Sequence, residues 1–159
     1  MDPIFDAEDI FDEIGGIADP EKPMFTLADL KVVQEDRCFI HYSPVDPEAR
    51  PVMVLNASGI PMKRYPTRTA YVRVVLKPTV KHCHLMMVIG LSVRAKLMFD
   101  LPHINTVWKV DLAVEPGSHV QEEEITKQIN DKERVCAALE NPHILKEVKA
   151  LLNPYEGES

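Results

Sequence analysis

The segment from Leu85 to Leu97 restricts the fold of this chain more than any other feature. It is apolar on nearly every side of a helix, and Arg94 and Lys96 are the first charged residues in it. Such a helix must be covered over most of its surface, and a β-sheet is the typical cover. Its apolar part is also shorter than the ~20 residues that a membrane span needs. We therefore predict a core helix that packs on a sheet.

Strand patterns flank this helix on both sides in the sequence. Apolar and polar residues alternate over 37–42, 70–77 and 108–114, as expected for half-buried strands. Cys38, Ile40 and Tyr42 share one face of the first segment. With helical patterns at both ends of the chain, the order is helices, strand, strand, helix, strand, helices. This order predicts an α+β fold, a two-layer domain in which a small β-sheet packs against helices.

The N-terminal region is acidic and helical in pattern. Residues 6–14 combine helical apolar spacing with carboxylates, which stabilise a helix N-terminus. Thr26 and Asp29 have the spacing of a capping box, which predicts a short helix there. The acidic helix is either a solvated segment or a docking peptide, whose apolar face would consist of Phe5, Ile10, Phe11 and Ile14.

The last third of the chain predicts two helices. The first begins with three glutamates at 122–124, and Asn141-Pro142 breaks it before the second. The apolar stripe of the first helix is predicted to contain Ile125, Ile129, Cys136 and Leu139, and that of the second Ile144, Leu145, Val148, Leu151 and Leu152.

Residues 43–68 are a long connection with five prolines, in which only Val52–Leu55 has a strand pattern. Long connections of this kind inside a domain are uncommon and are usually functional or mobile. We interpret it as an insertion between two strands. The predicted organisation is an acidic helical segment at 1–18, a single domain at 19–152 with this insertion, and a tail at 153–159.

Composition restricts the class of partner. The formal net charge is −7, which disfavours nucleic acid and anionic membrane surfaces as partners. The acidic start does not resemble a signal peptide, and three widely spaced cysteines do not suggest a disulfide framework. We therefore expect free thiols in a reducing compartment, which predicts a cytoplasmic protein.

Cys83 is the residue with the most suggestive surroundings. It lies in Pro78-Thr79-Val80-Lys81-His82-Cys83-His84, between a predicted strand and the core helix. The start of a helix favours a thiolate, which is both the nucleophilic and the metal-binding form of cysteine. Residue chemistry alone leaves two interpretations open, a reactive thiolate and a buried cysteine that simply packs well.

Other candidate sites have weaker support. Adjacent side chains such as His82 and Cys83 cannot readily converge on one zinc ion, and the chain has no C-x-x-C pair. Cys38 and Cys136 are both expected in the core. The charged run at 131–134 has the composition of a solvated helix face.

Taken in order, these residues resemble a known family. The matching elements are Asp19–Pro23, Thr26-Leu27, Pro78-Thr79-Val80, His82-Cys83, Ile89-Gly90-Leu91, Gly117-Ser118-His119, Lys127-Gln128-Ile129, Asp131–Val135 and Glu140-Asn141-Pro142. The chain resembles the cytosolic iron–sulfur cluster assembly component 2 family, whose relatives include the bacterial and archaeal SufT-type proteins. The likeness covers 3–34 and 78–152, and it rests on the order and joint spacing of these elements.

The resemblance implies a non-catalytic adaptor subunit of the cytosolic iron–sulfur targeting complex, located in the cytoplasm and also in the nucleus. The implied partners are a β-propeller subunit, a HEAT-repeat scaffold, apo iron–sulfur client proteins and a second copy in a homodimer. Neither a membrane nor nucleic acid is among them. The resemblance implies no stably bound cofactor, and it allows a transient iron–sulfur cluster.

The resemblance also assigns roles to residues. Cys83 corresponds to the family's reactive cysteine, which makes it the reactive thiol, the transient cluster ligand and the one metal-binding residue implied. Supporting roles fall to Thr79, His82 and His119, and a partner-binding role falls to Asp131, Lys132, Glu133 and Arg134. Two departures are Lys81, where the family usually has proline, and the insertion at 43–68, which is longer than the family's usual connection.

Three functions remain as hypotheses. In the first, an adaptor ligates a cluster transiently through Cys83, with the other ligands from a partner, a second copy or the client, because a cluster normally needs four. In the second, the chain is a pure interaction module and Cys83 only shapes a docking surface. In the third, it is a thiol-dependent enzyme or redox sensor in which Cys83 acts with His82 or His119.

Overall fold

The fold is a small sheet with helices packed on one face. The computed structural model describes residues 4–44, 50–78, 83–102, 106–116 and 122–152. Its helices and strands are α1 (Ala7–Gly15), the 3₁₀ helix η1 (Glu35–Arg37), β1 (Cys38–Pro44), β2 (Val52–Leu55), β3 (Pro61–Arg64), β4 (Arg68–Leu76), α2 (Cys83–Asp100), β5 (Thr106–Val114), α3 (Glu122–Asn130), α4 (Lys132–Glu140) and α5 (Pro142–Leu152).

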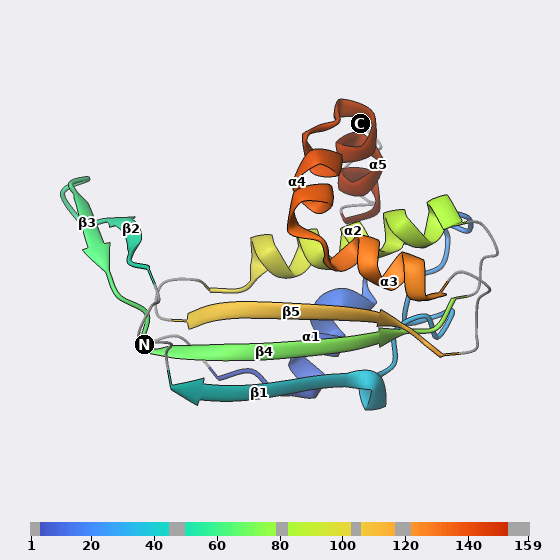
Figure 1. The fold of residues 1–159 in the computed structure, drawn as a ribbon, viewed down its shortest axis with the longest axis horizontal. Coiled ribbons are helices and arrows are strands. Elements are labelled where there is room, and N and C mark those ends of the chain that lie inside the picture. Colours follow the sequence, from blue (N-terminus) through green and yellow to red (C-terminus); the bar gives the residue numbers. More distant parts are fainter. Residues whose placement is uncertain (1–3, 45–49, 79–82, 103–105, 117–121, 153–159) are drawn as a thin grey trace.

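The main sheet has three strands in the order β1-β4-β5 (Figure 1). β1 pairs with β4 in antiparallel fashion, and β4 pairs with β5 in parallel. The parallel pair requires a crossover, which α2 provides by running back along one face of the sheet. The predicted α+β class, the three main strands and the element order are confirmed.

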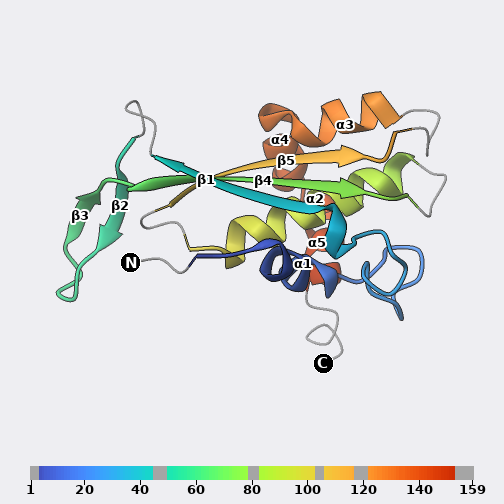
Figure 2. The same ribbon diagram turned by 90° about the horizontal axis from the view of Figure 1, so that it is seen from below.

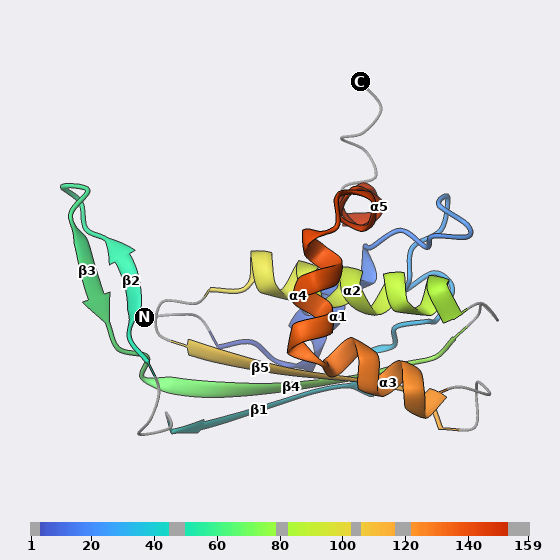
Figure 3. The ribbon, with the colours of Figure 1, turned by 45° about the horizontal axis from the view of Figure 1, so that its top comes forward.

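The core explains why α2 is apolar nearly all round. On one side Met86, Ile89 and Val93 are fully buried in the main cluster with the sheet residues. On the other side Leu91 and Ala95 pack in a second cluster that includes Val135 and Val148, from α4 and α5. Figure 3 shows α4 and α5 stacked over α2 on the side away from the sheet. The helix is therefore covered by the sheet and by the C-terminal helices together.

The acidic N-terminal helix packs against the body of the chain. Asp6 and Asp9 form a capping box at its start, with both hydrogen bonds at 2.9 Å. Ile10 and Ile14 are completely buried in the core, and Phe5 packs edge-on against Trp108, at 5.8 Å between ring centroids. Its apolar face is thus already covered by this chain, so the suggestion that this face seeks an outside partner was wrong.

The short helix predicted after Thr26 does not form. The capping box does: Asp29 accepts from the Thr26 backbone at 2.9 Å, and Thr26 Oγ1 accepts from the Asp29 backbone at 3.1 Å. However, Lys31 has a φ of 60°, in the left-handed region, and the backbone N–H of Val32 donates to the Leu27 carbonyl. This αL closure resembles a helix C-cap, and it limits the segment to a turn.

The predicted C-terminal helix at 122–140 is two helices. Asp131 interrupts it and caps α4, because its carboxylate accepts from the backbone N–H groups of Glu133 and Arg134. The break changes the helical phase, so that Val135 is buried and Cys136 is exposed. The core position predicted for Cys136 was therefore wrong, whereas the break at Asn141-Pro142 is confirmed.

The insertion at 43–68 contains a β-hairpin. The predicted fragment Val52–Leu55 is β2, and the sequence reading missed its partner β3 (Pro61–Arg64). Figure 2 shows this hairpin beyond the end of the three-stranded sheet. Figure 1 places it at the opposite end of the molecule from the start of α2.

None of the helices within the described ranges is long and apolar enough to cross a membrane.

Candidate functional site

Cys83 is the first residue of α2. Its backbone lies at the end of the sheet where the parallel strands β4 and β5 both finish, in register at Leu76 and Val114 (Figure 1). In α/β sheets, this carboxyl end of parallel strands is the usual place for a binding site. The helix N-terminus there has unpaired backbone N–H groups, which favour a thiolate.

Several contacts tie this end of the sheet together. The Lys77 backbone N–H donates to the Val32 carbonyl at 2.9 Å, and the Glu115 backbone N–H donates to the Leu76 carbonyl at 2.8 Å. Arg37 of η1 forms an ion pair with Glu115 at 2.6 Å, and both side chains are partly buried. The backbone that leads into the Cys83 segment therefore starts from a well-anchored position.

The predicted partners of Cys83 fall outside the described part of the chain. Thr79, His82 and His119 are not among the described residues, and nothing is described of the Cys83 side chain. Their roles stay predictions. Among the residues that the structure does describe, no three His, Cys, Asp or Glu side chains lie close enough to hold a metal ion.

Cys38 has the environment of an inert thiol. It is 3% exposed, and its Sγ donates a weak hydrogen bond to the Gln34 carbonyl at 3.4 Å. Burial, together with the nearby carboxylates of Asp36 and Glu35, raises the pKa of the thiol to about 11. The thiol is therefore protonated at neutral pH, and the core role predicted for it is confirmed.

The charged run at 131–134 lies at the start of α4, and its four side chains are exposed. Arg134 is close to two carboxylates, those of Glu124 and Asp131, at 3.8 Å each. The preceding residue, Asn130, contacts Arg94, which follows Cys83 by eleven residues on α2. At 1.5 Å per residue, this places the run about 16 Å along α2 from Cys83. The two candidate regions are therefore well separated along α2.

A groove borders the charged run. Its volume is about 540 Å³, and it lies between the C-terminal half of α2, the edge of β5 and the start of α4. The apolar residues in it include Leu97, Trp108 and Val135, and the positive residues are Arg94, Lys109 and Lys132. Basic groups around an apolar floor suit an acidic segment with apolar side chains.

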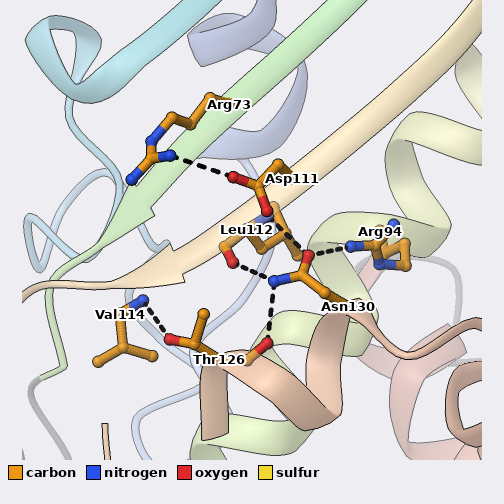
Figure 4. Close-up of polar contacts among 7 residues, drawn as sticks. All are labelled: Arg73, Arg94, Asp111, Leu112, Val114, Thr126 and Asn130. Carbon is orange, nitrogen blue, oxygen red and sulfur yellow. Dashed lines mark hydrogen bonds and ion pairs between the residues drawn. The ribbon is translucent and has the colours of Figure 1, made fainter. Parts of the chain in front are cut away.

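Asn130 holds α3 against the edge of β5, a role that the sequence reading missed (Figure 4). Its amide makes the pair of hydrogen bonds that a neighbouring strand would make. Nδ2 donates to the Leu112 carbonyl at 2.6 Å, and Oδ1 accepts from the Leu112 N–H at 2.9 Å. Oδ1 also accepts from Arg94 at 2.6 Å, and Thr126 Oγ1 accepts from the Val114 N–H at 3.1 Å. These contacts cover the edge of β5 next to the groove.

Burial of the Arg94 guanidinium lowers its pKa, although it still carries a charge at neutral pH. The only sequence feature that relates to this arrangement is the position of Asn130, just before the break between α3 and α4. An asparagine in that position is also typical of an ordinary helix end, so the pattern could not identify its partner strand.

Comparison with known proteins identifies the family. No protein-family model matches the chain. Protein AE7 of Arabidopsis thaliana is 44% identical over 147 residues, which are 92% of this chain and 75% of that protein. The MIP18 family protein FAM96A of Dictyostelium discoideum is 39% identical over 146 residues, 92% of this chain and 91% of that protein.

A mouse relative has a functional name. The cytosolic iron–sulfur assembly component 2B of Mus musculus is 38% identical over 148 residues, which are 93% of this chain and 73% of that protein. Matches at this level over most of both sequences agree with the resemblance seen in the motifs. The chain therefore belongs to the MIP18 family, to which the cytosolic iron–sulfur assembly component 2 proteins belong.

Proposed function

We propose that this chain is a non-catalytic adaptor in cytosolic iron–sulfur protein assembly, in which Cys83 takes part in the handover of a cluster. The observation that carries the proposal is the 38% identity, over most of both chains, to the mouse protein named as a cytosolic iron–sulfur assembly component. The proposal places the chain in the cytosol, and in the nucleus where its clients are found there.

The position of Cys83 supports its part in the proposal. A thiolate at the start of α2 is stabilised by the helix dipole, whereas the buried Cys38 stays protonated. A single thiolate supplies one of the four ligands that a cluster normally takes. The remaining ligands would come from a partner or from the client, so the cluster is cargo that passes through the site.

The groove beside α4 supports a docking role for the opposite part of α2. In the proposal, Lys132 and its neighbours bind an acidic segment of a partner subunit, either the β-propeller protein or the HEAT-repeat scaffold. The groove lies along the C-terminal half of α2 and Cys83 is at its first residue, so a partner held in the groove leaves the start of α2 uncovered.

The Cys83 role is tested by complementation in cells that lack their own copy of the protein. Cys83→Ser is expected to fail to restore the activity of cytosolic iron–sulfur enzymes, while Cys38→Ala, at a buried thiol that does not line the groove, restores it. Full restoration by Cys83→Ser would exclude the thiol from the handover. In that case the chain would act only as an interaction module.

The adaptor role is tested by affinity capture of tagged protein from native cytosol. Wild type and Cys83→Ala should both recover a β-propeller protein and a HEAT-repeat scaffold, and Cys83→Ala alone should lose apo-clients. Lys132→Glu in the groove should weaken recovery of the partner, while Lys146→Glu, on the exposed side of α5, should not. If wild type recovers neither partner, the adaptor proposal is wrong.

A further inference from the structure

The outer edge of β5 is covered along only part of its length. β5 is the last strand of the main sheet, so within the described part of the chain this edge has no partner strand (Figure 1). Asn130 and Thr126 bind the edge at Leu112 and Val114 (Figure 4). The groove of about 540 Å³ borders the earlier part of the strand, at residues 107–110. An uncovered strand edge is a place where a further strand can add.

The direction of the backbone groups shows what the uncovered part of the edge presents. In a strand, the N–H and C=O groups of successive residues point to opposite edges. Both groups of Leu112 point outward to Asn130, whereas the Glu115 N–H points inward to a β4 carbonyl. The N–H and C=O groups of Trp108 and Val110 therefore point outward as well, and no hydrogen bond from another described residue reaches them there. Two donors and two acceptors are thus available beside the groove.

The apolar wall of the groove is already formed next to these groups. The Trp108 indole N–H donates to the Pro102 carbonyl at 2.6 Å, and Phe5 packs edge-on against the indole. Leu97 of α2 and Val135 of α4 line the same groove. Alternate side chains of a strand point to the same face of a sheet, so every second side chain of an added strand would pack against this wall.

The charged side chains that line the groove are all positive. They are Arg94, Lys109 and Lys132, and the described residues of the lining include no aspartate or glutamate. Lys109 lies on the other face of the sheet from Trp108, with its Nζ 5.7 Å from the centre of the Tyr71 ring. A carboxylate on an added strand would form an opposite-charge pair with Lys109 on that face. The edge therefore suits a strand in which apolar and acidic residues alternate.

We propose that the edge of β5 binds an extended acidic segment of a partner protein as a fourth strand of the main sheet. Hydrogen bonds to the Trp108 and Val110 backbone give affinity, and the alternating side chains give specificity. At about 3.3 Å per residue, about four residues of the segment cover the uncovered part of the edge. Asn130 ends the site, because its amide already occupies the edge at Leu112. This inference rests on the docking role proposed above for the groove.

A short acidic segment fits this edge better than other occupants. Nucleic acid or an anionic membrane would face a larger part of the chain, whose net charge is −7. Screening limits charge effects to about 8 Å at physiological ionic strength, so a short segment responds mainly to the positive groove. A second copy paired through the same edge would bring Lys109 and Lys132 near their own counterparts, and like charges oppose this. A helix in the groove would leave the outward groups of Trp108 and Val110 without partners.

A synthetic peptide tests the proposal on the full chain. The probe is a fluorescein-labelled seven-residue peptide in which Glu and Val alternate, and fluorescence anisotropy should show saturable binding. At saturation, amide hydrogen exchange measured by NMR should become at least tenfold slower at Trp108 and Val110. The Lys109 amide, which points to β4, should keep its rate. The same peptide with Lys in place of Glu should bind at least tenfold more weakly.

Two results of this experiment would overturn the proposal. The first is no binding of the Glu–Val peptide at about 1 mM. The second is a bound peptide that leaves exchange at both Trp108 and Val110 unchanged. If that happens while Lys132→Glu still weakens capture of a partner from cytosol, the adaptor function stands and only strand addition fails.

Methylation of the peptide backbone separates strand pairing from side-chain contacts. An extended peptide points the N–H groups of alternate residues to one edge, so only one alternate set can bond to β5. N-methylation of that set should weaken binding at least tenfold, and N-methylation of the other set should weaken it less than threefold. A peptide that tolerates both methylations would overturn the proposal.

Variants of the chain provide a second test of the same edge. Val110→Pro removes an outward N–H and no hydrogen bond to β4, and proline is accepted on edge strands. This variant and Lys132→Glu should each bind the Glu–Val peptide at least tenfold more weakly, whereas Lys146→Glu on the exposed side of α5 should bind as wild type does. Circular dichroism checks that Val110→Pro folds, and the methylated peptides test the edge of the unchanged protein if it does not. Undiminished binding by folded Val110→Pro would overturn the proposal.

Discussion

Three cysteines of this chain occupy three different environments. Cys38 is buried in β1, Cys136 is exposed on α4, and Cys83 begins α2. Thiol reactivity follows the fraction of thiolate and the access of the reagent, so identical side chains should differ greatly in rate.

The first prediction concerns this difference. At pH 8, iodoacetamide should modify Cys136 within minutes and leave Cys38 unmodified in the folded protein, because burial holds the Cys38 pKa at about 11. Both should react at similar rates in 6 M guanidinium chloride. Peptide mass spectrometry measures the two rates, and equal rates in the folded protein would contradict the buried position of Cys38.

Glu13 gives a second prediction at this scale. Burial, a hydrogen bond to Asp100 and the charge of Asp100 raise the Glu13 pKa to about 7, and Lys96 opposes this shift. The same hydrogen bond lowers the Asp100 pKa, so the pair holds one proton and Glu13 carries it. A pKa that is higher in the folded state than in the unfolded chain stabilises the fold most at pH values below the pKa of the unfolded chain. This stabilisation is therefore complete below about pH 4.5 and is lost as the pH rises to about 7.

Glu13→Gln keeps a hydrogen-bond donor for Asp100 but cannot titrate. Its free energy of unfolding should therefore fall less than that of wild type between pH 5 and pH 7.5. Urea unfolding of both proteins at several pH values measures the difference between their free energies of unfolding. The other titrating groups contribute equally to both proteins, so their contributions cancel in this difference. Parallel pH profiles for the two proteins would show that Glu13 is not protonated in the fold.

At the scale of elements, α3 is held in place by side chains from two neighbours. Asn130 and Thr126 bind the edge of β5, and Arg94 of α2 binds Asn130 and the Ile129 carbonyl. Arg73 and Asp111 form a further, exposed pair at 3.3 Å on the adjacent strands (Figure 4). The interactions of Asn130 are the more important ones, because they involve part-buried backbone groups.

Asn130→Ala should lower the free energy of unfolding by about 2–3 kcal/mol, because it removes the partner of the Leu112 backbone N–H and carbonyl and one of the two acceptors of Arg94. Hydrogen exchange at the Leu112 amide should become faster as well. Gln128→Ala, whose side chain bonds to the exposed Glu124 on the same helix, is the control and should change stability by less than about 0.5 kcal/mol. If Asn130→Ala changes the free energy of unfolding only slightly, water must take over the hydrogen bonds of the missing amide.

Gly90 permits the close approach of α2 and α3. A Cβ atom at Gly90 would lie 2.7 Å from Cγ2 and 3.1 Å from Cβ of Ile129. Gly90→Ala should therefore destabilise the protein by about 1–3 kcal/mol, although alanine is the better helix former. In an Ile129→Ala background the same change should cost less, because the contacts with Cγ2 and Cδ1 are then absent and only the one with Cβ remains. Gly16→Ala, which meets nothing within 4 Å, serves as the control in the same urea titrations.

Local patterns predicted some of these elements well and others poorly. The alternation that places Val72, Val74 and Leu76 on one face of β4 is a local property, and the structure confirms it. Thr26 and Asp29 did form their capping box, but the left-handed conformation of Lys31 ended the helix, and no pattern indicates that for lysine.

Longer-range features were beyond the sequence reading. The use of Asn130 as a substitute strand depends on β5, eighteen residues earlier, and the exposure of Cys136 depends on a break that Asp131 introduces. The candidate site shows the same limit. Its sequence position predicts a helix start for Cys83, which the structure confirms, whereas its side-chain partners stay predictions.

At the scale of the whole molecule, we expect the hairpin and the body to be separate units of stability. β1 and β4 pair up to Pro44 and Arg68, and the hairpin extends from this point without packing on the core. Replacing residues 45–67 with Asn-Gly, a two-residue turn suited to antiparallel strands, should therefore change the free energy of unfolding by less than about 1 kcal/mol. Urea unfolding at low protein concentration measures this. A large loss of stability would show that the body needs its hairpin.

The hairpin also has a consequence for how fast the chain folds. Pairing β1 with β4 means closing a loop of 23 residues, and the entropy lost on closure grows with loop length. When β2 and β3 pair first, they bring residues 52 and 64 side by side and leave only two short links to close. β-Hairpins form within about 1–10 μs, well before most domains fold. A preformed hairpin thus lets an insertion of this size add surface at little cost in folding rate.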